Sequence, residues 1–136
     1  HKTHLASYRE ILIGGTKYKE LASQIRSLND LSGIPFIGLA DGTGSRELYH
    51  RYFLSHGLMF APDMEAATTD QILPMITHNL GIGFYPEELA AEAIARGNAY
   101  AIRLVEPIPE REICLVTNSS TQISAAVRKV ISFLSV

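Results

Sequence analysis

Apolar residues follow two different spacings along the chain, one typical of buried strands and one typical of amphipathic helices. Short, mostly apolar segments bounded by glycine, proline or polar residues predict strands, at residues 10–13, 35–39, 63–66, 82–85, 100–104 and 112–117. Apolar residues three and four positions apart predict helices, at residues 45–56, 68–80, 87–96 and after 121. Because strands and helices alternate, the sequence predicts an α/β fold with a largely parallel sheet.

Several helix boundaries carry recognisable capping residues. Gly57 is predicted to end the helix at 45–56 in the left-handed conformation, and Gly81 is predicted to close the next helix. Thr68 and Gln71 have the spacing of a capping box, in which each side chain binds a backbone N–H of the other residue. The polar run 118–121 offers N-cap residues for the last helix.

Composition narrows the class of protein. A chain of 136 residues is long enough for one domain with a buried core, and its net charge is only -2. The twelve Lys and Arg residues are scattered, which argues against a nucleic-acid surface on this segment. The single cysteine, Cys114, excludes an internal disulfide and is expected to be a small buried residue of a strand.

The ends and apolar runs of the chain give an expectation about its location. No apolar run approaches the length of a membrane span, and the N-terminus has no signal-peptide pattern, so we expect a cytoplasmic protein without membrane contact. The first residue is His1 rather than Met. We therefore expect this chain to be a piece of a longer protein.

Polar residues gather at two turns that each lead from a predicted strand to a predicted helix. In a parallel sheet such turns lie at the carboxyl ends of the strands, where ligands of open α/β sheets usually bind. Each helix start also offers free N–H groups and the positive end of the helix dipole. We therefore expect a cradle for a small anion, although plain structural turns and capping roles remain the alternative. The candidate ligand-binding residues are Thr43, Gly44, Ser45, Thr68 and Thr69.

The sequence contains no complete motif for catalysis, metal binding or cofactor binding. The segment 42–45 lacks the lysine and the spacing of a P-loop, and it is not a dinucleotide fingerprint. The five histidines do not combine with Cys or carboxylates at metal-ligand spacing. Ser45 has no identifiable general base and does not lie in a G-x-S-x-G turn. The sequence predicts binding rather than turnover, with no catalytic residue, metal or cofactor.

Three blocks of sequence carry a resemblance to a known family. They are PFIGLADGTGSRELYHRYF, EAATTDQILPMITHNLGIGFYPEEL, and EREICLVT followed by the terminal helix. With these blocks the chain resembles the C-terminal effector-binding domain of LysR-type transcriptional regulators, without its N-terminal part. The resemblance implies a fold like type 2 periplasmic binding proteins, in which two α/β lobes are joined by two crossover strands and a small effector binds in the cleft.

The resemblance also implies a division of the chain. Residues 14–111 would form one lobe, residues 9–13 and 112–117 the crossover strands, and residues 118–136 the terminal helix of the other lobe. In the family, helix starts of this lobe contact the effector, which is commonly a small metabolite and often a carboxylate. By position these contacts match the residues of the predicted cradle, namely Thr43, Gly44, Ser45, Thr68 and Thr69.

The function implied is ligand sensing for a DNA-binding transcriptional regulator, in which the effector shifts the population of lobe closures. The expected partners are a small-molecule effector, a second copy of the chain, and DNA only through an N-terminal domain absent from this chain. One alternative is a solute-binding protein of the same fold that serves transport. The other is a small enzyme on a related two-lobed scaffold, resembling a prephenate dehydratase or a deaminase.

Overall fold

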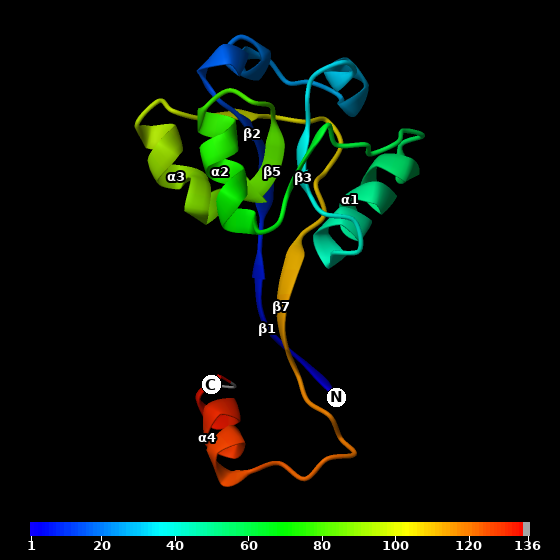
Figure 1. Ribbon diagram of the computed structural model, residues 1–136, viewed down its shortest axis with the longest axis vertical. Coiled ribbons are helices and arrows are strands. Elements are labelled where there is room, and N and C mark those ends of the chain that lie inside the picture. Colours follow the sequence, from blue (N-terminus) through cyan, green and yellow to red (C-terminus); the bar gives the residue numbers. More distant parts are fainter. Residues whose placement is uncertain (135–136) are drawn as a thin grey trace. The chain divides into compact units, whose positions relative to one another are not determined.

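The computed structural model describes residues 1–134, and these fall into two compact units (Figure 1). The larger unit is Arg9–Pro109, and the smaller unit combines His1–Tyr8 with Glu110–Val136. The predicted terminal segment 118–136 therefore includes two residues, 135 and 136, that lie outside the described part. The division into one lobe and two crossover strands stays a prediction.

The larger unit is built on strands with mixed directions. The strands are β2 (Glu10–Gly14), β3 (Ile37–Leu39), β4 (Met64–Ala66), β5 (Gly83–Pro86) and β6 (Tyr100–Ile102). Strands β3 and β4 pair in parallel, and a parallel bridge between Phe36 and Ile82 links β3 to β5. Strand β2 pairs antiparallel with both β5 and β6. The predicted α/β fold is confirmed, and β2 is the one strand of this unit that runs against the other four.

Helices cover both faces of these strands, with α1 on one side and α2 and α3 on the other (Figure 1). The helices are α1 (Gly44–Ser55), α2 (Thr69–Thr77) and α3 (Glu87–Ala95), and short 3-10 turns span Thr16–Tyr18, Leu21–Ser23 and Leu28–Leu31. Successive residues of β2 contribute to different cores, because side chains of a strand alternate between faces. Leu12 packs in the cluster under α1, and Ile13 packs in the cluster under α2 and α3.

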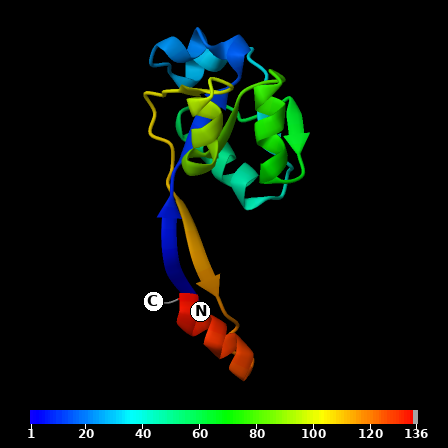
Figure 2. The ribbon, with the colours of Figure 1, turned by 90° about the vertical axis from the view of Figure 1, so that its left-hand side faces the viewer.

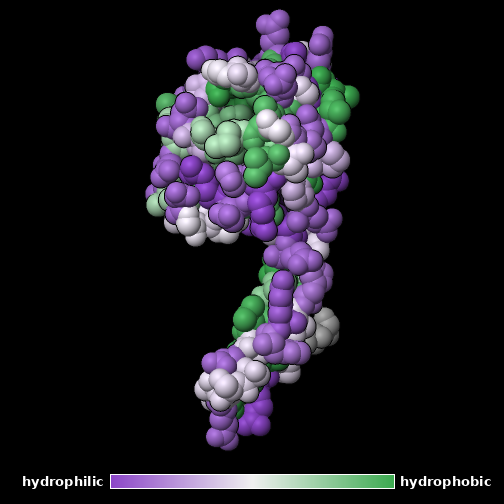
Figure 3. Space-filling model, turned by 90° about the vertical axis from the view of Figure 1, so that its right-hand side faces the viewer, coloured by the Kyte–Doolittle hydropathy of each residue, from purple (hydrophilic) through white to green (hydrophobic). Residues whose placement is uncertain are grey.

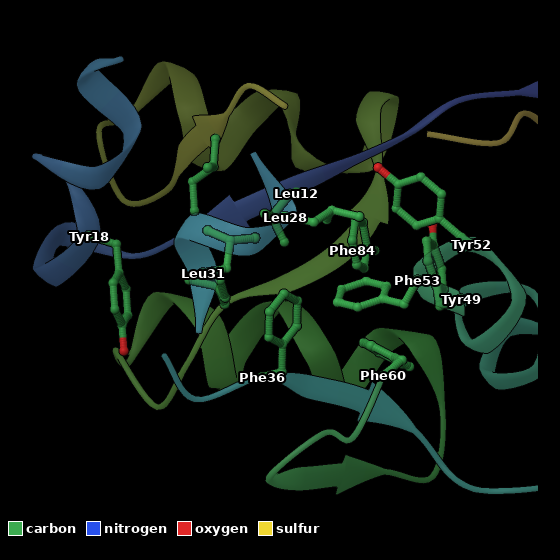
Figure 4. Close-up of a cluster of buried hydrophobic side chains, with 12 residues drawn as sticks. Leu12, Tyr18, Leu28, Leu31, Phe36, Tyr49, Tyr52, Phe53, Phe60 and Phe84 are labelled. Atoms are coloured by element: carbon green, nitrogen blue, oxygen red, sulfur yellow. The ribbon is translucent and has the colours of Figure 1, made fainter. Parts of the chain in front are cut away.

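The core under α1 is rich in aromatic rings (Figure 4). Tyr49 of α1 stacks on Phe84 of β5 with ring centroids 4.1 Å apart. Tyr52 is buried, and its hydroxyl donates to the Glu106 carbonyl at 2.9 Å. Burial, and secondarily the nearby Glu106 carboxylate, raise the pKa of the Tyr52 phenol well above its usual range. Such rings combine a large buried area with specific edge and face contacts, so this core positions α1 firmly.

Two predicted boundaries of α2 are wrong. The capping box does not form, because the Gln71 side chain accepts from the Ala67 N–H at 2.9 Å and the Thr68 side chain makes no capping hydrogen bond. The helix also ends before Gly81: Asn79 takes the left-handed conformation, with φ of 63°. Gly81 serves a close approach instead, since a Cβ there would lie 2.6 Å from the carbonyl oxygen of Pro35. Gly57, with φ of 75°, ends α1 as predicted.

The smaller unit contains a two-stranded ribbon and one helix. Strand β1 (Lys2–Tyr8) pairs antiparallel with β7 (Arg111–Val116), and Figure 2 shows the two strands side by side. The sequence did not predict β1. Cys114 lies in a strand as predicted, but it is half-buried rather than buried.

The smaller unit also contains helix α4 (Ala125–Leu134). Its predicted N-cap in the run 118–121 is wrong, because Ser124 accepts the Val127 N–H at 3.3 Å. The apolar side chains of α4 are largely exposed, Phe133 most of all at 73%. Figure 3 shows apolar residues, in green, at the surface of both units. Among residues 1–134, no helix has both the length and the apolar character needed to cross a membrane.

Candidate functional site

The two predicted turns lie at the carboxyl ends of neighbouring strands. Strand β3 leads through residues 40–43 into α1, and β4 leads through residues 67–68 into α2 (Figure 1). Because β3 and β4 pair in parallel, both helix starts lie at the same edge of the strands. Helix N-termini at this position present backbone N–H groups to a ligand.

The start of α1 is fixed by Thr43. Its hydroxyl donates to the Ala40 carbonyl at 2.9 Å and accepts the Arg46 N–H at 3.1 Å. Thr43 is thus the N-cap of α1, and its hydroxyl proton is already committed to the protein. Gly44 and Ser45 occupy the first turn, where backbone N–H groups have no acceptor within the helix.

The start of α2 is arranged differently. Thr68 is the N-cap and is exposed, and its side chain makes no capping hydrogen bond. Thr69 is the first helical residue and is half-buried. Asp70 follows in the first turn, where a carboxylate interacts favourably with the helix dipole. Burial, and secondarily Asp70, raise the pKa of the nearby Tyr85 phenol above its usual value.

A small cavity of about 20 Å³ receives residues from both helix starts. Ser45 of α1 and Thr69 of α2 both line it, whereas Thr43, Gly44 and Thr68 are not among its lining residues. Its walls are completed by apolar residues of β3 and β5 and by Phe60. A cavity of this size holds about one water molecule. The structure therefore brings two of the five candidate residues together and leaves three outside this cavity.

Arg46 lines the same cavity, and the sequence analysis missed it. Its side chain is 16% exposed, and Nη1 donates to the Leu39 carbonyl at 3.1 Å and to the Glu65 carboxylate at 3.2 Å. The guanidinium also lies 5.9 Å from the centre of the Phe60 ring. The sequence did contain a signal for Arg46. It lies in the first turn of a predicted helix, where the helix dipole disfavours a cation, so an interaction elsewhere in the fold was needed to explain its position.

Glu10 is a second lining residue that the sequence analysis missed. It begins β2 and is 8% exposed, and the Tyr49 hydroxyl donates to its Oε1. Buried carboxylates are rare unless hydrogen-bonded or paired. The signal in the sequence was a charged residue at the head of an otherwise apolar strand.

The cavity thus combines an acidic and a basic side chain with two hydroxyl groups. Glu10 and Arg46 carry opposite charges, and Ser45 and Thr69 each add a hydroxyl that can donate or accept. Within the described part of the chain, no three His, Cys, Asp or Glu side chains are grouped so that they could hold a metal ion. The arrangement can hold a small polar group by hydrogen bonds and charge.

Comparison with known proteins points to one family. The family described as LysR substrate binding domain matches residues 1–135 of the chain. A comparison with curated proteins finds no match.

Solved structures of LysR-type regulators are similar to the chain. The effector binding domain of QuiR in complex with shikimate has a TM-score of 0.82, with 98% of this chain and 63% of that chain covered. The regulatory domain of Synechocystis PCC6803 CcmR in complex with 2-PG has a TM-score of 0.83, with 98% and 64% covered. The regulatory domain of CrgA, a LysR-type regulator from Neisseria meningitidis, has a TM-score of 0.70, with 98% and 66% covered.

All three structures share 17% sequence identity with the chain, so they establish its fold and no more. The chain spans less than two thirds of the length of each. The expected fold, that of type 2 periplasmic binding proteins, is confirmed.

Proposed function

We propose that this chain, which belongs to the LysR substrate binding domain family, senses a small metabolite for a DNA-binding transcriptional regulator. The ligand would bind at the edge of the strands where α1 and α2 begin. One observation carries the proposal: Ser45 and Thr69, from the starts of two helices on neighbouring parallel strands, line one cavity together with Arg46.

The charge at this edge supports an anionic group on the ligand. Two helix starts contribute N–H groups and the positive ends of their dipoles, and Arg46 adds a guanidinium that is also paired with Glu65. The related domains of QuiR and CcmR hold shikimate and 2-PG. We assign direct contact to Ser45 and Thr69, backbone contact to Gly44 and Thr68, and positioning of the α1 start to Thr43.

The proposed mechanism is a shift between lobe arrangements. The remaining polypeptide would supply the other lobe and the DNA reader, with crossover strands that include residues 9–13 and 112–117 and a terminal segment at 118–136. A ligand that binds one arrangement more tightly raises the population of that arrangement. DNA contact would come only through the DNA reader, in a homo-oligomer that works in the cytoplasm.

The family assignment favours regulation over the two alternatives. Members of the family are ligand-binding domains of transcriptional regulators, whereas the transport and enzyme alternatives have only the shared scaffold in their favour. Binding with differential affinity is sufficient for such a role, so no residue needs to be assigned to catalysis.

Calorimetry on the full-length gene product tests the proposal, with shikimate and 2-PG as separate probes. We expect Ser45→Ala and Thr69→Ala each to weaken binding of the better probe by about tenfold to a hundredfold, the cost of one lost hydrogen bond to an anion. Ser55→Ala and Thr77→Ala are the matched controls, because these hydroxyls lie at the opposite ends of the same two helices and donate to backbone carbonyls there. Equal affinities in all four variants would place the site elsewhere.

A further inference from the structure

We infer that Glu65 sets the charge of the ligand that this site accepts: by pairing with Arg46 it favours an anion with one negative charge over a more highly charged one. The inference rests on the proposed function and names the chemical class of its ligand. The class is a small monocarboxylate rather than a phosphate ester or a polycarboxylate.

The strand β4 places Glu65 beside Arg46. Side chains of a strand alternate between its two faces. Ala66, the next residue of β4, is buried in the cluster under α2 and α3, so Glu65 projects to the opposite face, on the side of α1. There Nη1 of Arg46 donates to Oε1 of Glu65 at 3.2 Å. Among residues 1–134, Glu65 is the one carboxylate within ion-pair distance of Arg46.

Arg46 connects Glu65 to the cavity. The guanidinium belongs to a residue that lines the cavity together with Ser45 and Thr69, whereas Glu65 is not among the lining residues. An anion in contact with this guanidinium would lie about one guanidinium's width from the Glu65 carboxylate. Because opposite charges in contact cancel much of each other's field, the pair attracts an anion less than Arg46 alone would. Glu65 therefore acts through Arg46 and needs no contact with the ligand.

The remaining positive charge of the site is small. Each of the two helix starts presents about half of an elementary positive charge, so together they match about one carboxylate. Glu47 and Asp70, in the first turns of α1 and α2, reduce this positive charge further. A second or third negative charge on the ligand would therefore gain little attraction from the helix starts, and Glu65 would repel it.

The charge of Glu65 can be removed without releasing Arg46. Nη1 of Arg46 also donates to the Leu39 carbonyl at 3.1 Å, and the guanidinium lies 5.9 Å from the centre of the Phe60 ring. In Glu65→Gln the side-chain amide oxygen can still accept from Nη1. The Glu65 side chain is half-exposed, and ion pairs with an exposed member contribute little to stability. We therefore expect Glu65→Gln to change the charge of the site and to keep its geometry.

Two pairs of matched probes test the inference on the full-length gene product. Shikimate is compared with shikimate 3-phosphate, and glycolate with 2-phosphoglycolate (2-PG). The second member of each pair carries an added phosphate with about −2 charge at pH 7. Calorimetry gives the affinity ratio within each pair. At low ionic strength we expect Glu65→Gln to shift this ratio about tenfold toward the phosphorylated member, roughly threefold for each added charge, and added salt to shrink the shift.

Two further variants separate the charge of Glu65 from other effects. Glu65→Asp keeps the charge and should keep the affinity ratio of the unchanged protein. Glu92→Gln is the matched control, because it also removes one negative charge and breaks an ion pair with an arginine, Arg96, at 2.7 Å on α3. It should leave the ratio as it is. The thermal unfolding of each variant separates a change in binding from a loss of fold.

The outcomes separate this inference from the proposed function. If Glu65→Gln leaves the ratio unchanged, or changes the affinity of both members equally, while Ser45→Ala still weakens binding, the inference is overturned and the proposed site stands. An equal shift of the ratio in Glu92→Gln would also overturn it, because the cause would then be the net charge of the chain. If none of the four probes binds, both the inference and the proposed function fail.

Discussion

The two units of the chain differ in what holds them together. In the larger unit, five large side chains are less than 2% exposed, and two aromatic and aliphatic clusters lie on opposite sides of the strands. In the smaller unit, none of the described residues 1–8 and 110–134 is buried. An isolated two-stranded ribbon and an isolated ten-residue helix are both marginal in water. The difference shows that a segment can form regular secondary structure without contributing to a packed core.

Hydrogen exchange should show the largest difference between the units. Amides in the β2–β5 pairing, such as those of Leu12 and Phe84, are expected to open only with global unfolding, which costs about 5–15 kcal/mol. Amides of α4 and β7 are expected to open at far lower cost. We predict protection factors at least about 1,000-fold higher in β2 and β5, measured on the isolated chain. Comparable protection in α4 would mean that something covers this helix in solution.

Truncation of one aromatic side chain in each unit is the next test. Phe84 is 6% exposed and Phe133 is 73% exposed. Phe84→Ala should lower the free energy of unfolding by about 3–5 kcal/mol because it leaves a cavity under α1. Phe133→Ala should change it by less than about 0.5 kcal/mol, as for most surface substitutions. Urea denaturation measures both, and a large loss for Phe133→Ala would contradict the contrast between the units.

Removal of a helix cap in each unit should give the smallest difference in stability between the units. Thr43 caps α1 in the larger unit, and Ser124 caps α4 in the smaller one. Thr43→Ala should cost about 1 kcal/mol of global stability, because α1 is packed on the core and its unfolding is coupled to that of the unit. Ser124→Ala should leave the global transition nearly unchanged and reduce only the helix content of α4, followed by circular dichroism. A shared loss in both variants would show that the two units unfold together.

The sequence predicted well where the signal is local. The periodic stretch 45–56 corresponds to α1 at Gly44–Ser55, and the two helix starts lie at one edge of the strands as expected. Strand β1 was missed because its residues are mostly polar, and its pairing with β7 joins segments more than one hundred residues apart. The capping box failed because the Gln71 side chain binds the N–H one residue before the N-cap.

For the candidate site too, the sequence could indicate only the parts that depend on local signals. Helix starts are visible in a sequence because capping residues and glycines mark them. The cavity itself is a tertiary feature, since Glu10 reaches it from β2 and Arg46 from α1. No local sequence pattern around either residue indicates that the two side chains line the same cavity. The family resemblance supplied the fold, but the charges that line the cavity became visible only once the strands and helices were in place.

Each of the two chain connections between the units contains one residue with a local backbone restraint. A single residue, Arg9, separates the end of β1 from the start of β2, and its carbonyl already accepts the Glu87 N–H at 2.9 Å at the start of α3. The return junction ends at Pro109, whose ring fixes φ near −65°. Each connection thus carries one local restraint, a backbone hydrogen bond at Arg9 and a ring at Pro109, and Pro109→Gly would widen the range of backbone angles open to that residue without touching either core.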